Sequence, residues 1–276
     1  MLKIRVLLLS ILFLPVNVLA QVTIAPTNLF LEENSRFGTF MVINGTNTPQ
    51  EVTVEFSFGY FATDEDGNKN FVTDDEAMEQ EYSIANNVRA FPQNFVLATG
   101  ARQIVRLRIN APRDLEEKTY WARIETTTTA ESPPVELGAS ESVSAEIGIK
   151  FKQITGLFYK VGNTTTGIEI DNITSDINRE EGKLFVKTNF QKLGNSPFLG
   201  TVNSRIMDSS GKEVLNSSLS TSFYVNSIHA QEFDISDLPN GTYTVNVEFV
   251  TERNDISESD LVQMSPVTST TTFSIQ

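Results

Sequence analysis

The sequence predicts an all-β protein made of two β-sandwich domains in tandem. Short runs in which apolar and polar residues alternate recur along the chain from residue 22 onward, and a period of two is typical of strands. Turn signals such as Asn44-Gly45 and Thr99-Gly100 separate these runs. The length of 276 residues, of which 39% are hydrophobic, suggests two domains that each bury a core.

The first 20 residues, "MLKIRVLLLSILFLPVNVLA", have the pattern of a secretory signal peptide. Lys3 and Arg5 precede an apolar run, and a small residue, Ala20, stands before the expected cut. The apolar run from 6 to 14 is too short to span a bilayer as a helix. We therefore expect a mature chain that starts at Gln21 and is exported.

Between residues 22 and 130 the alternating runs predict an antiparallel sandwich of the immunoglobulin type without a helix. Pro26 interrupts the first run and places it at an edge or a kink. The predicted strands are 22–31, 37–44, 51–58, two strands within 86–110 around Thr99-Gly100, and 119–127. Residues 64–70 are expected to be a turn, and the acidic runs 74–81 and 253–260 solvated loops.

After residue 161 the pattern restarts and predicts a second sandwich of seven strands. They are expected within 167–173, 183–191, 198–208, 213–225, 229–235, 242–250 and 267–276. The boundary is expected near residues 160–166. The predicted domains are thus the signal peptide at 1–20, a first immunoglobulin-like domain at 21–161 and a second at 162–276.

Composition and motifs argue against several classes of function. The formal charge is −14, and it becomes −16 when the two basic residues of the signal peptide are removed, so a nucleic-acid partner is not expected. Without cysteine the chain has no disulfide and no thiol chemistry. The single histidine, His229, is expected to be a surface or packing residue, and no nucleotide-binding, hydrolase or zinc-protease motif is present.

Residues 64–70, "DEDGNKN", have part of the spacing of a calcium loop. Lys69 occupies the position where an EF-hand has glycine, and Asp75 the one where it has glutamate, so a polar turn is the preferred interpretation. We therefore expect no enzyme activity, no cofactor, no metal site and no small-molecule substrate.

The segment 141–162, "ESVSAEIGIKFKQITGLFYKVG", predicts an unusually long strand with one apolar face. The alternation extends to Tyr159, about 17 residues, whereas strands usually have about 5 to 6. The apolar positions of its first part are Val143, Ala145, Ile147, Ile149 and Phe151. In one interpretation this face closes the domain's own core, and in the other it is offered to a partner.

Two blocks of the first domain resemble the PapD-like periplasmic pilus chaperones. "FPQNFVLATGARQIVRL" matches the pattern P…F.L..G..Q.VR of that family through Pro92, Phe95, Leu97, Gly100, Gln103, Val105 and Arg106. "GLFYKV" at 156–161 is similar to the family's K-L-F-Y-R-P at the end of the last strand of the first domain. The resemblance covers residues 22–161, and the second domain matches only as another sandwich.

The resemblance implies a periplasmic chaperone that lends this last strand to a fimbrial or pilus subunit by donor-strand complementation. The physical basis is β-augmentation, in which backbone hydrogen bonds extend a sheet while alternate side chains fill a groove of the partner. The donated residues would be Val143, Ala145, Ile147, Ile149 and Phe151. The implied partners are pilus subunits and an outer-membrane usher.

The sequence departs from the family at the cationic anchor for the subunit's terminal carboxylate. The family's Arg and Lys correspond to Asn28 and Gly156, so Lys150 and Lys152 are the candidates for that role. Glu117 and Lys160 fall near two members of the family's interdomain salt bridge. Arg106 is interpreted as a solvated residue on a sheet face, and the family's alternative is a stem beside the subunit-binding cleft.

The competing function is that of a secreted or surface protein of immunoglobulin-like fold without chaperone activity. "ISDLPNGTYTV" at 235–245 is similar to the last domain of bacterial surface proteins that carry a C-terminal sorting domain. The chain continues past this segment and lacks the basic ending expected of such a domain.

Overall fold

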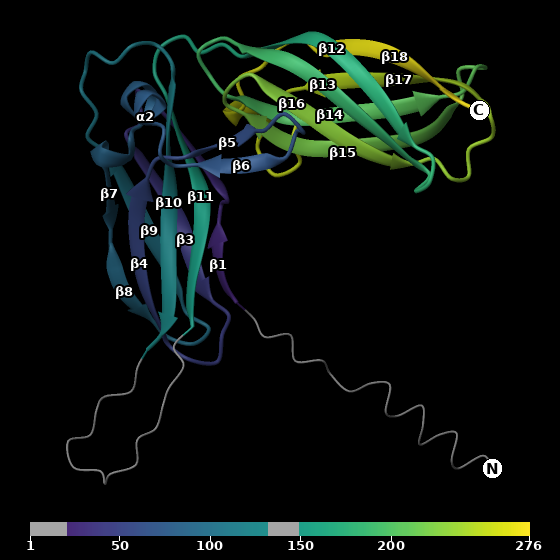
Figure 1. Ribbon diagram of the computed structural model, residues 1–276. Coiled ribbons are helices and arrows are strands. Elements are labelled where there is room, and N and C mark those ends of the chain that lie inside the picture. Colours follow the sequence, from purple (N-terminus) through teal and green to yellow (C-terminus); the bar gives the residue numbers. More distant parts are fainter. Residues whose placement is uncertain (1–20, 132–148) are drawn as a thin grey trace, which may run out of the picture.

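The computed structural model describes residues 21–131 and 149–276, which form two β-sandwiches that meet at a bend (Figure 1). The fold class expected from the sequence is therefore confirmed. The part of the chain that the structure describes contains no helix that is both long and apolar enough to cross a membrane.

Two sheets form the first sandwich. One has the strand order β1-β3-β9-β7, with the bounds Val22–Ala25, Phe37–Asn44, Arg102–Ile109 and Val88–Phe91. The other has the order β2-β11-β10-β4-β8, with the bounds Asn28–Glu32, Lys150–Lys160, Thr119–Ala130, Gln50–Ser57 and Asn94–Leu97. Buried side chains from both sheets, such as Val42, Val105, Leu107, Ile124 and Leu157, share one core.

Two prolines explain where this arrangement departs from the predicted strands. Pro26 divides the first run into β1 and β2, which pair in different sheets, as the predicted kink allows. Pro92 ends β7, so the segment 86–110 contains the three strands β7, β8 and β9 where two were expected. Proline lacks the amide hydrogen that continues a ladder, and the chain changes sheets at both positions.

The second sandwich confirms the seven strands expected after residue 161. One sheet has the order β12-β13-β16, with the bounds Gly167–Asn178, Lys183–Leu193 and Ser227–Asp234. The other has the order β15-β14-β17-β18, with the bounds Glu213–Phe223, Phe198–Met207, Gly241–Val250 and Val267–Ile275. Aromatic residues, among them Phe190, Phe198, Phe223 and Phe249, fill its core.

A helix replaces one of the two acidic loops expected from the sequence. α2 covers Glu76–Tyr82, and the side chain of Asp75 caps its start by accepting a hydrogen bond from the Met78 amide at 3.1 Å. Two 3₁₀ turns, η2 (Ala85–Asn87) and η3 (Glu258–Asp260), complete the helical elements of the described chain. Glu76 and Glu79 stand in the first turn of α2, where negative charge stabilises a helix.

The hairpin of β5 (Tyr60–Thr63) and β6 (Lys69–Val72) leaves the first sandwich and reaches the second (Figure 1). The Ile228 amide of β16 donates a hydrogen bond to Thr63 Oγ1 at 2.8 Å. Lys69 Nζ lies 2.5 Å from Thr221 Oγ1, and Lys187 Nζ lies 2.8 Å from Asp66 Oδ1. The hairpin thus contacts both β15 and β16 of the second sandwich.

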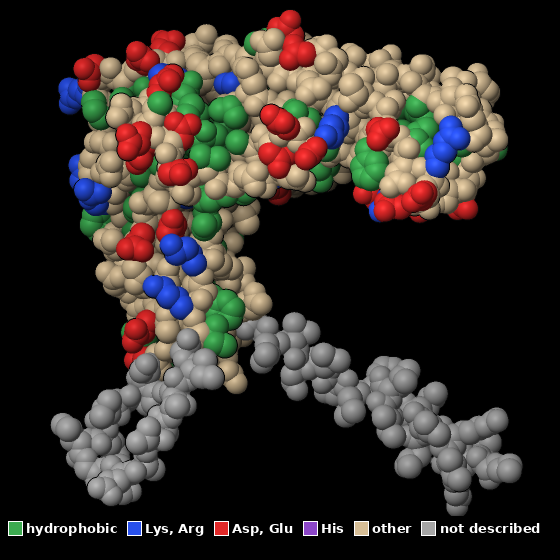
Figure 2. All heavy atoms as spheres, viewed as in Figure 1, with side chains coloured by type: hydrophobic (Ala, Val, Ile, Leu, Met, Phe, Trp, Pro, Cys, Tyr) green, Lys and Arg blue, Asp and Glu red, His purple; other side chains and the backbone are tan. Residues whose placement is uncertain are grey.

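A mixed aromatic and aliphatic cluster joins the two sandwiches at the bend. Trp121 and Phe158 of the first sandwich, Tyr60 of the hairpin and Tyr224 and Leu261 of the second are buried together. Hydrophobic side chains gather at the same corner in Figure 2. Because this apolar surface is removed from water, it stabilises the bend.

Candidate functional site

The candidate site is the first half of β11, which has a neighbouring strand on one side only. β10 pairs with β11 along its whole length, from Lys150 to Lys160. On the other side β2 pairs only with Gly156–Lys160. Within the described residues, the edge of β11 from Lys150 to Thr155 therefore has no partner strand, and we call this stretch the open edge.

The direction of the backbone groups identifies which residues face the open edge. The Gly156 amide donates to Thr27 and the Lys160 carbonyl accepts from Glu33, so even-numbered residues face the side of β2. The Val161 amide donates to Lys118 instead, on the side of β10. Because these directions alternate along a strand, the amides and carbonyls of Lys150, Lys152 and Ile154 point to the open edge.

Exposed apolar side chains lie on the open edge and directly before it. Phe151 and Ile149 belong to the same face as Leu157 and Tyr159, which are fully buried in the core of the first sandwich. Phe151 is 55% and Ile149 61% exposed, so this face passes from core to solvent within one strand. Ile154, on the opposite face, is 47% exposed. Soluble proteins usually avoid an unpaired strand edge with large apolar side chains.

Only part of the predicted donor strand lies in the described chain. Ile149 and Phe151 are placed as stated above, whereas Val143, Ala145 and Ile147 lie outside the described residues. The described strand β11 begins at Lys150.

The two lysines of the open edge differ in their surroundings. Lys152 Nζ lies 2.5 Å from Glu125 Oε2 on β10, and Ser57 also donates a hydrogen bond to that carboxylate. The hydrogen bond from Lys152 lowers the pKa of the Glu125 carboxyl against the opposing effect of its burial. Lys150 is exposed. To bind the carboxylate of a partner, Lys152 would therefore have to share its ammonium group with Glu125 or break this salt bridge.

The family's two anchor positions lie in one row with a third residue. Asn28 of β2 pairs with Gly156 of β11, which pairs with Arg123 of β10. A Cβ on Gly156 would lie 2.6 Å from Asn28 Oδ1, so the amide of Asn28 fills the space that a side chain at 156 would need. A side chain at 156 therefore requires Asn28 to take another rotamer.

Arg123, the cation of this row, is buried at the junction of the domains. Its Nε donates to the Gly59 carbonyl at 2.8 Å, and its guanidinium lies 5.2 Å from the ring centre of Tyr224 and 5.7 Å from that of Phe71. The sequence predicts the strand 119–127 that contains Arg123 but does not single out this residue. Only its position in the alternating run, beside Trp121, marks it as a residue of this face.

Glu117 and Lys160, the predicted interdomain pair, do not pair with each other. Lys160 forms a salt bridge with Glu32 at 3.2 Å, and its Nζ lies 3.5 Å from the Asp260 carbonyl of the second sandwich. Glu117 accepts a hydrogen bond from the Asn163 amide at 3.2 Å, beside Gly162, whose φ is +59°. Each residue thus contacts the junction through a different partner.

The remaining candidates show no catalytic arrangement. His229 is buried against Phe223 and Phe249, and burial lowers its pKa to about 4. Of the segment 64–70, residues 64–68 form the turn of the β5–β6 hairpin, and 69–70 begin β6. In the turn, Asp64 accepts hydrogen bonds from the Asp66 and Asn68 amides. The described residues contain no group of three or more histidines and acids placed to bind a metal ion.

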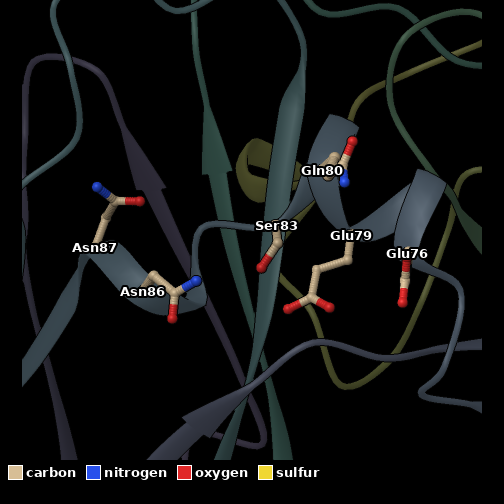
Figure 3. Close-up of a pocket in the computed structure, with 6 residues that line it drawn as sticks. All are labelled: Glu76, Glu79, Gln80, Ser83, Asn86 and Asn87. Carbon is tan, nitrogen blue, oxygen red and sulfur yellow. The ribbon is translucent and has the colours of Figure 1, made fainter.

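A shallow hollow beside α2 is lined only by polar side chains. Its volume is about 310 Å³, and its walls come from α2 and the following turn, including Glu79, Ser83 and Asn86 (Figure 3). The side chains shown include no base paired with a nucleophile, so the hollow suggests no reaction.

Arg106 lies on the outer face of the first sandwich. It is exposed on β9, opposite Thr39 and Phe91, and β9 belongs to the sheet that does not contain β11. The structure agrees with the interpretation of Arg106 as a solvated residue on a sheet face.

Comparison by sequence connects the second sandwich with exported proteins. A family model described as a secretion system C-terminal sorting domain matches residues 178–256. No curated protein matches the chain.

Comparison by structure finds chaperones of fimbriae and pili. The Pseudomonas aeruginosa CupB2 chaperone is 10% identical, with a TM-score of 0.39, over 90% of this chain and 98% of that one. CsuC, from its complex with the tip subunit CsuE of Acinetobacter baumannii Csu pili, is 11% identical, with a TM-score of 0.44, over 90% and 98%. The E. coli chaperone DraB is 12% identical, with a TM-score of 0.42, over 93% and 98%.

Proposed function

We propose that this protein is an exported chaperone that holds subunits of a pilus or another surface structure through the open edge of β11. The observation that carries the proposal is the coincidence, on one short stretch, of unpaired backbone groups and exposed apolar side chains. Lys150, Lys152 and Ile154 supply the amides and carbonyls, and Ile149 and Phe151 supply the apolar surface. The motifs around Pro92 and Leu157 support the same function by resemblance.

β-Augmentation is the mechanism that this edge favours. A strand of the subunit would lie beside β11 in the place that β2, which begins opposite Gly156, leaves empty. Its backbone would pair with the alternate residues of the open edge. Ile149 and Phe151 would fill a groove of the subunit and lose their contact with water. Burying side chains of this size contributes about 1.5 to 3 kcal/mol each.

The first test replaces the apolar side chains while leaving the backbone in place. In the variant Ile149→Thr with Phe151→Thr, threonine keeps the preference for a strand. Because both side chains are exposed, the melting temperature should stay within a few degrees of the wild type. Subunits that co-purify with the wild-type protein from the periplasm should be reduced by at least tenfold, as measured by quantitative mass spectrometry.

Leu219→Thr is the matched control, since Leu219 is an exposed apolar residue of a strand in the second sandwich. It should retain the co-purifying subunits. A double variant that unfolds, or one that retains its partners as the control does, would overturn the proposal.

A second candidate function is that of an exported surface protein without chaperone activity. The match of residues 178–256 to a secretion sorting domain favours it. Fractionation of cells separates the two functions, because a chaperone stays in the periplasm whereas a sorted surface protein is found at the cell surface or in the medium. An outer-membrane usher is expected as a further partner only under the chaperone proposal.

A further inference from the structure

The outer face of the first sandwich carries unusual charge for so acidic a protein. On β9 every second residue points outward, and three of these are the arginines Arg102, Arg106 and Arg108, joined by Arg89 on the neighbouring strand β7. We call the surface of these four residues the arginine face. The strands β1, β3, β9 and β7 contain no Asp and no Glu, although the formal charge of the chain is −14.

None of these four arginines has an acidic partner within the described residues. Among the residues that the structure describes, 21–131 and 149–276, no salt bridge involves any of the four. Arg89 donates hydrogen bonds to the carbonyls of Val88 and Asn86. Arg102, Arg106 and Arg108 are exposed, so their positive charge is available to a partner.

Large apolar side chains lie among the arginines. Phe37 is 65%, Phe91 57% and Ile104 55% exposed. Arg108 is paired with Phe37 across β3 and β9, and its guanidinium lies 6.0 Å from the centre of that ring. Arg106 is paired with Phe91 across β9 and β7. Apolar and cationic groups thus alternate over one face of the sheet.

The choice of arginine favours a protein partner over a lipid surface. Protein interfaces are enriched in arginine and aromatic residues and depleted in lysine, whereas membrane-binding surfaces use lysine and arginine alike. The strands β1, β3, β9 and β7 contain no lysine, although lysines are about as frequent in the sequence as arginines. A symmetric contact between two copies through this face would bring arginines against arginines and is disfavoured by their repulsion.

From this geometry we propose that the arginine face binds an extended acidic segment of another protein, with apolar side chains between its carboxylates. Alternate residues of a strand are about 6.6 Å apart, so a second extended chain repeats the spacing of Arg102, Ile104, Arg106 and Arg108. Its acids would meet the guanidinium groups, and its apolar residues would cover Phe37, Phe91 and Ile104. This surface lies on the sheet that does not contain β11, so its partner is held independently of the open edge.

The test uses a fluorescently labelled peptide in which glutamate and leucine alternate over eight residues. Fluorescence anisotropy with the full mature protein should show saturable binding that weakens as salt is raised. The variant Arg106→Ala with Arg108→Ala should bind at least tenfold more weakly. The charge-matched variant Arg179→Ala with Lys212→Ala, which removes two exposed cations of the second sandwich, should change the affinity less than twofold.

Two further arms separate the proposal from its alternatives. Ile149→Thr with Phe151→Thr should bind the peptide as the wild type does, because the open edge is not involved. Phe37→Ser should weaken binding, since the face requires an apolar contact beside Arg108. The proposal is overturned if binding does not saturate, if both charge variants lose it equally, if the edge variant loses it, or if phosphatidylglycerol vesicles bind the arginines while the peptide does not.

Discussion

At the scale of single residues, Arg123 shows how one side chain serves both the strand and the junction. Its backbone belongs to β10, while its guanidinium donates to the Gly59 carbonyl and lies 5.7 Å from the ring centre of Phe71 and 5.2 Å from that of Tyr224. Phe71 belongs to the hairpin and Tyr224 to the second sandwich. Arg123 therefore fixes three parts of the molecule that are distant in sequence.

Replacing Arg123 should reduce stability. Arg123→Ala removes a buried charged donor from the Gly59 carbonyl, and hydrogen bonds of charged groups contribute about 1.5 to 3 kcal/mol. We expect the free energy of unfolding, measured by urea denaturation, to fall by about this amount. Arg123→Lys keeps the charge but not the planar donor, so its free energy of unfolding should lie between those of the wild type and Arg123→Ala. An alanine variant as stable as the wild type would contradict this role.

His229 gives the second sandwich a dependence on pH that can be measured. Burial, with the nearby charge of Lys69, lowers its pKa to about 4 in the folded protein, against about 6.5 in an unfolded chain. The unfolded state therefore binds more protons between these values, and stability falls as the pH drops from about 6.5 toward about 4. Relative to His229→Gln, the wild type should lose roughly 3 kcal/mol across this window. A difference between the two proteins that does not change with pH would contradict the prediction.

At the scale of elements, the sequence predicts strands well where alternation alone decides them. All seven strands of the second sandwich were expected, because each combines a period of two with a turn signal. α2 was missed, because seven residues are too few for a periodic pattern and the cap at Asp75 depends on local geometry. The division at Pro92 was missed because a proline permits a strand boundary without requiring one.

The open edge could be predicted only in part. Alternation identified the apolar face of β11, including Ile149 and Phe151, but it contains no information on where the neighbouring strand stops. β2 begins opposite Gly156 because the chain leaves β1 at Pro26 and then pairs with β11. This pairing joins residues that are far apart in sequence. The burial of Arg123 is hidden for the same reason, since its neighbours come from the hairpin and the second domain.

A pair of proline variants tests the direction of the backbone groups in β11. Ile154→Pro removes an amide that faces the open edge, so the pairing with β10 should survive and stability should change little. The Gln153 amide faces β10, so Gln153→Pro should break that ladder and cost about 1 to 3 kcal/mol for the carbonyl left unpaired. Urea denaturation measures both, and equal losses of stability would show that the assigned directions are wrong.

At the scale of the whole molecule, the bend between the sandwiches is held by contacts of two kinds. The aromatic cluster around Trp121 buries apolar surface, and the β5–β6 hairpin adds directed polar contacts to β15, β16 and Lys187. Gly67 at the hairpin tip lies so close to Ala230 that a Cβ there would approach the Ala230 Cβ to 2.6 Å. The hairpin therefore fits the second sandwich closely, and we expect the two domains to unfold together.

Shortening the hairpin tests this role. Replacing residues 63–69 by Asn-Gly joins Ala62 to Asn70, which are already cross-strand partners, through a two-residue turn that suits a hairpin. The change removes the hydrogen bond from Ile228, the salt bridge of Asp66 and the contact of Lys69, while the aromatic residues of β5 and β6 remain.

In the shortened protein we expect two thermal transitions where the wild type has one, and small-angle X-ray scattering should show a larger radius of gyration. The same Asn-Gly replacement at 208–212, the turn between β14 and β15, is the control, because that turn belongs to a single domain. Its transition and scattering should match the wild type. If the shortened hairpin also matches the wild type, the aromatic cluster alone holds the bend, because the polar contacts would then be dispensable for the arrangement of the two sandwiches.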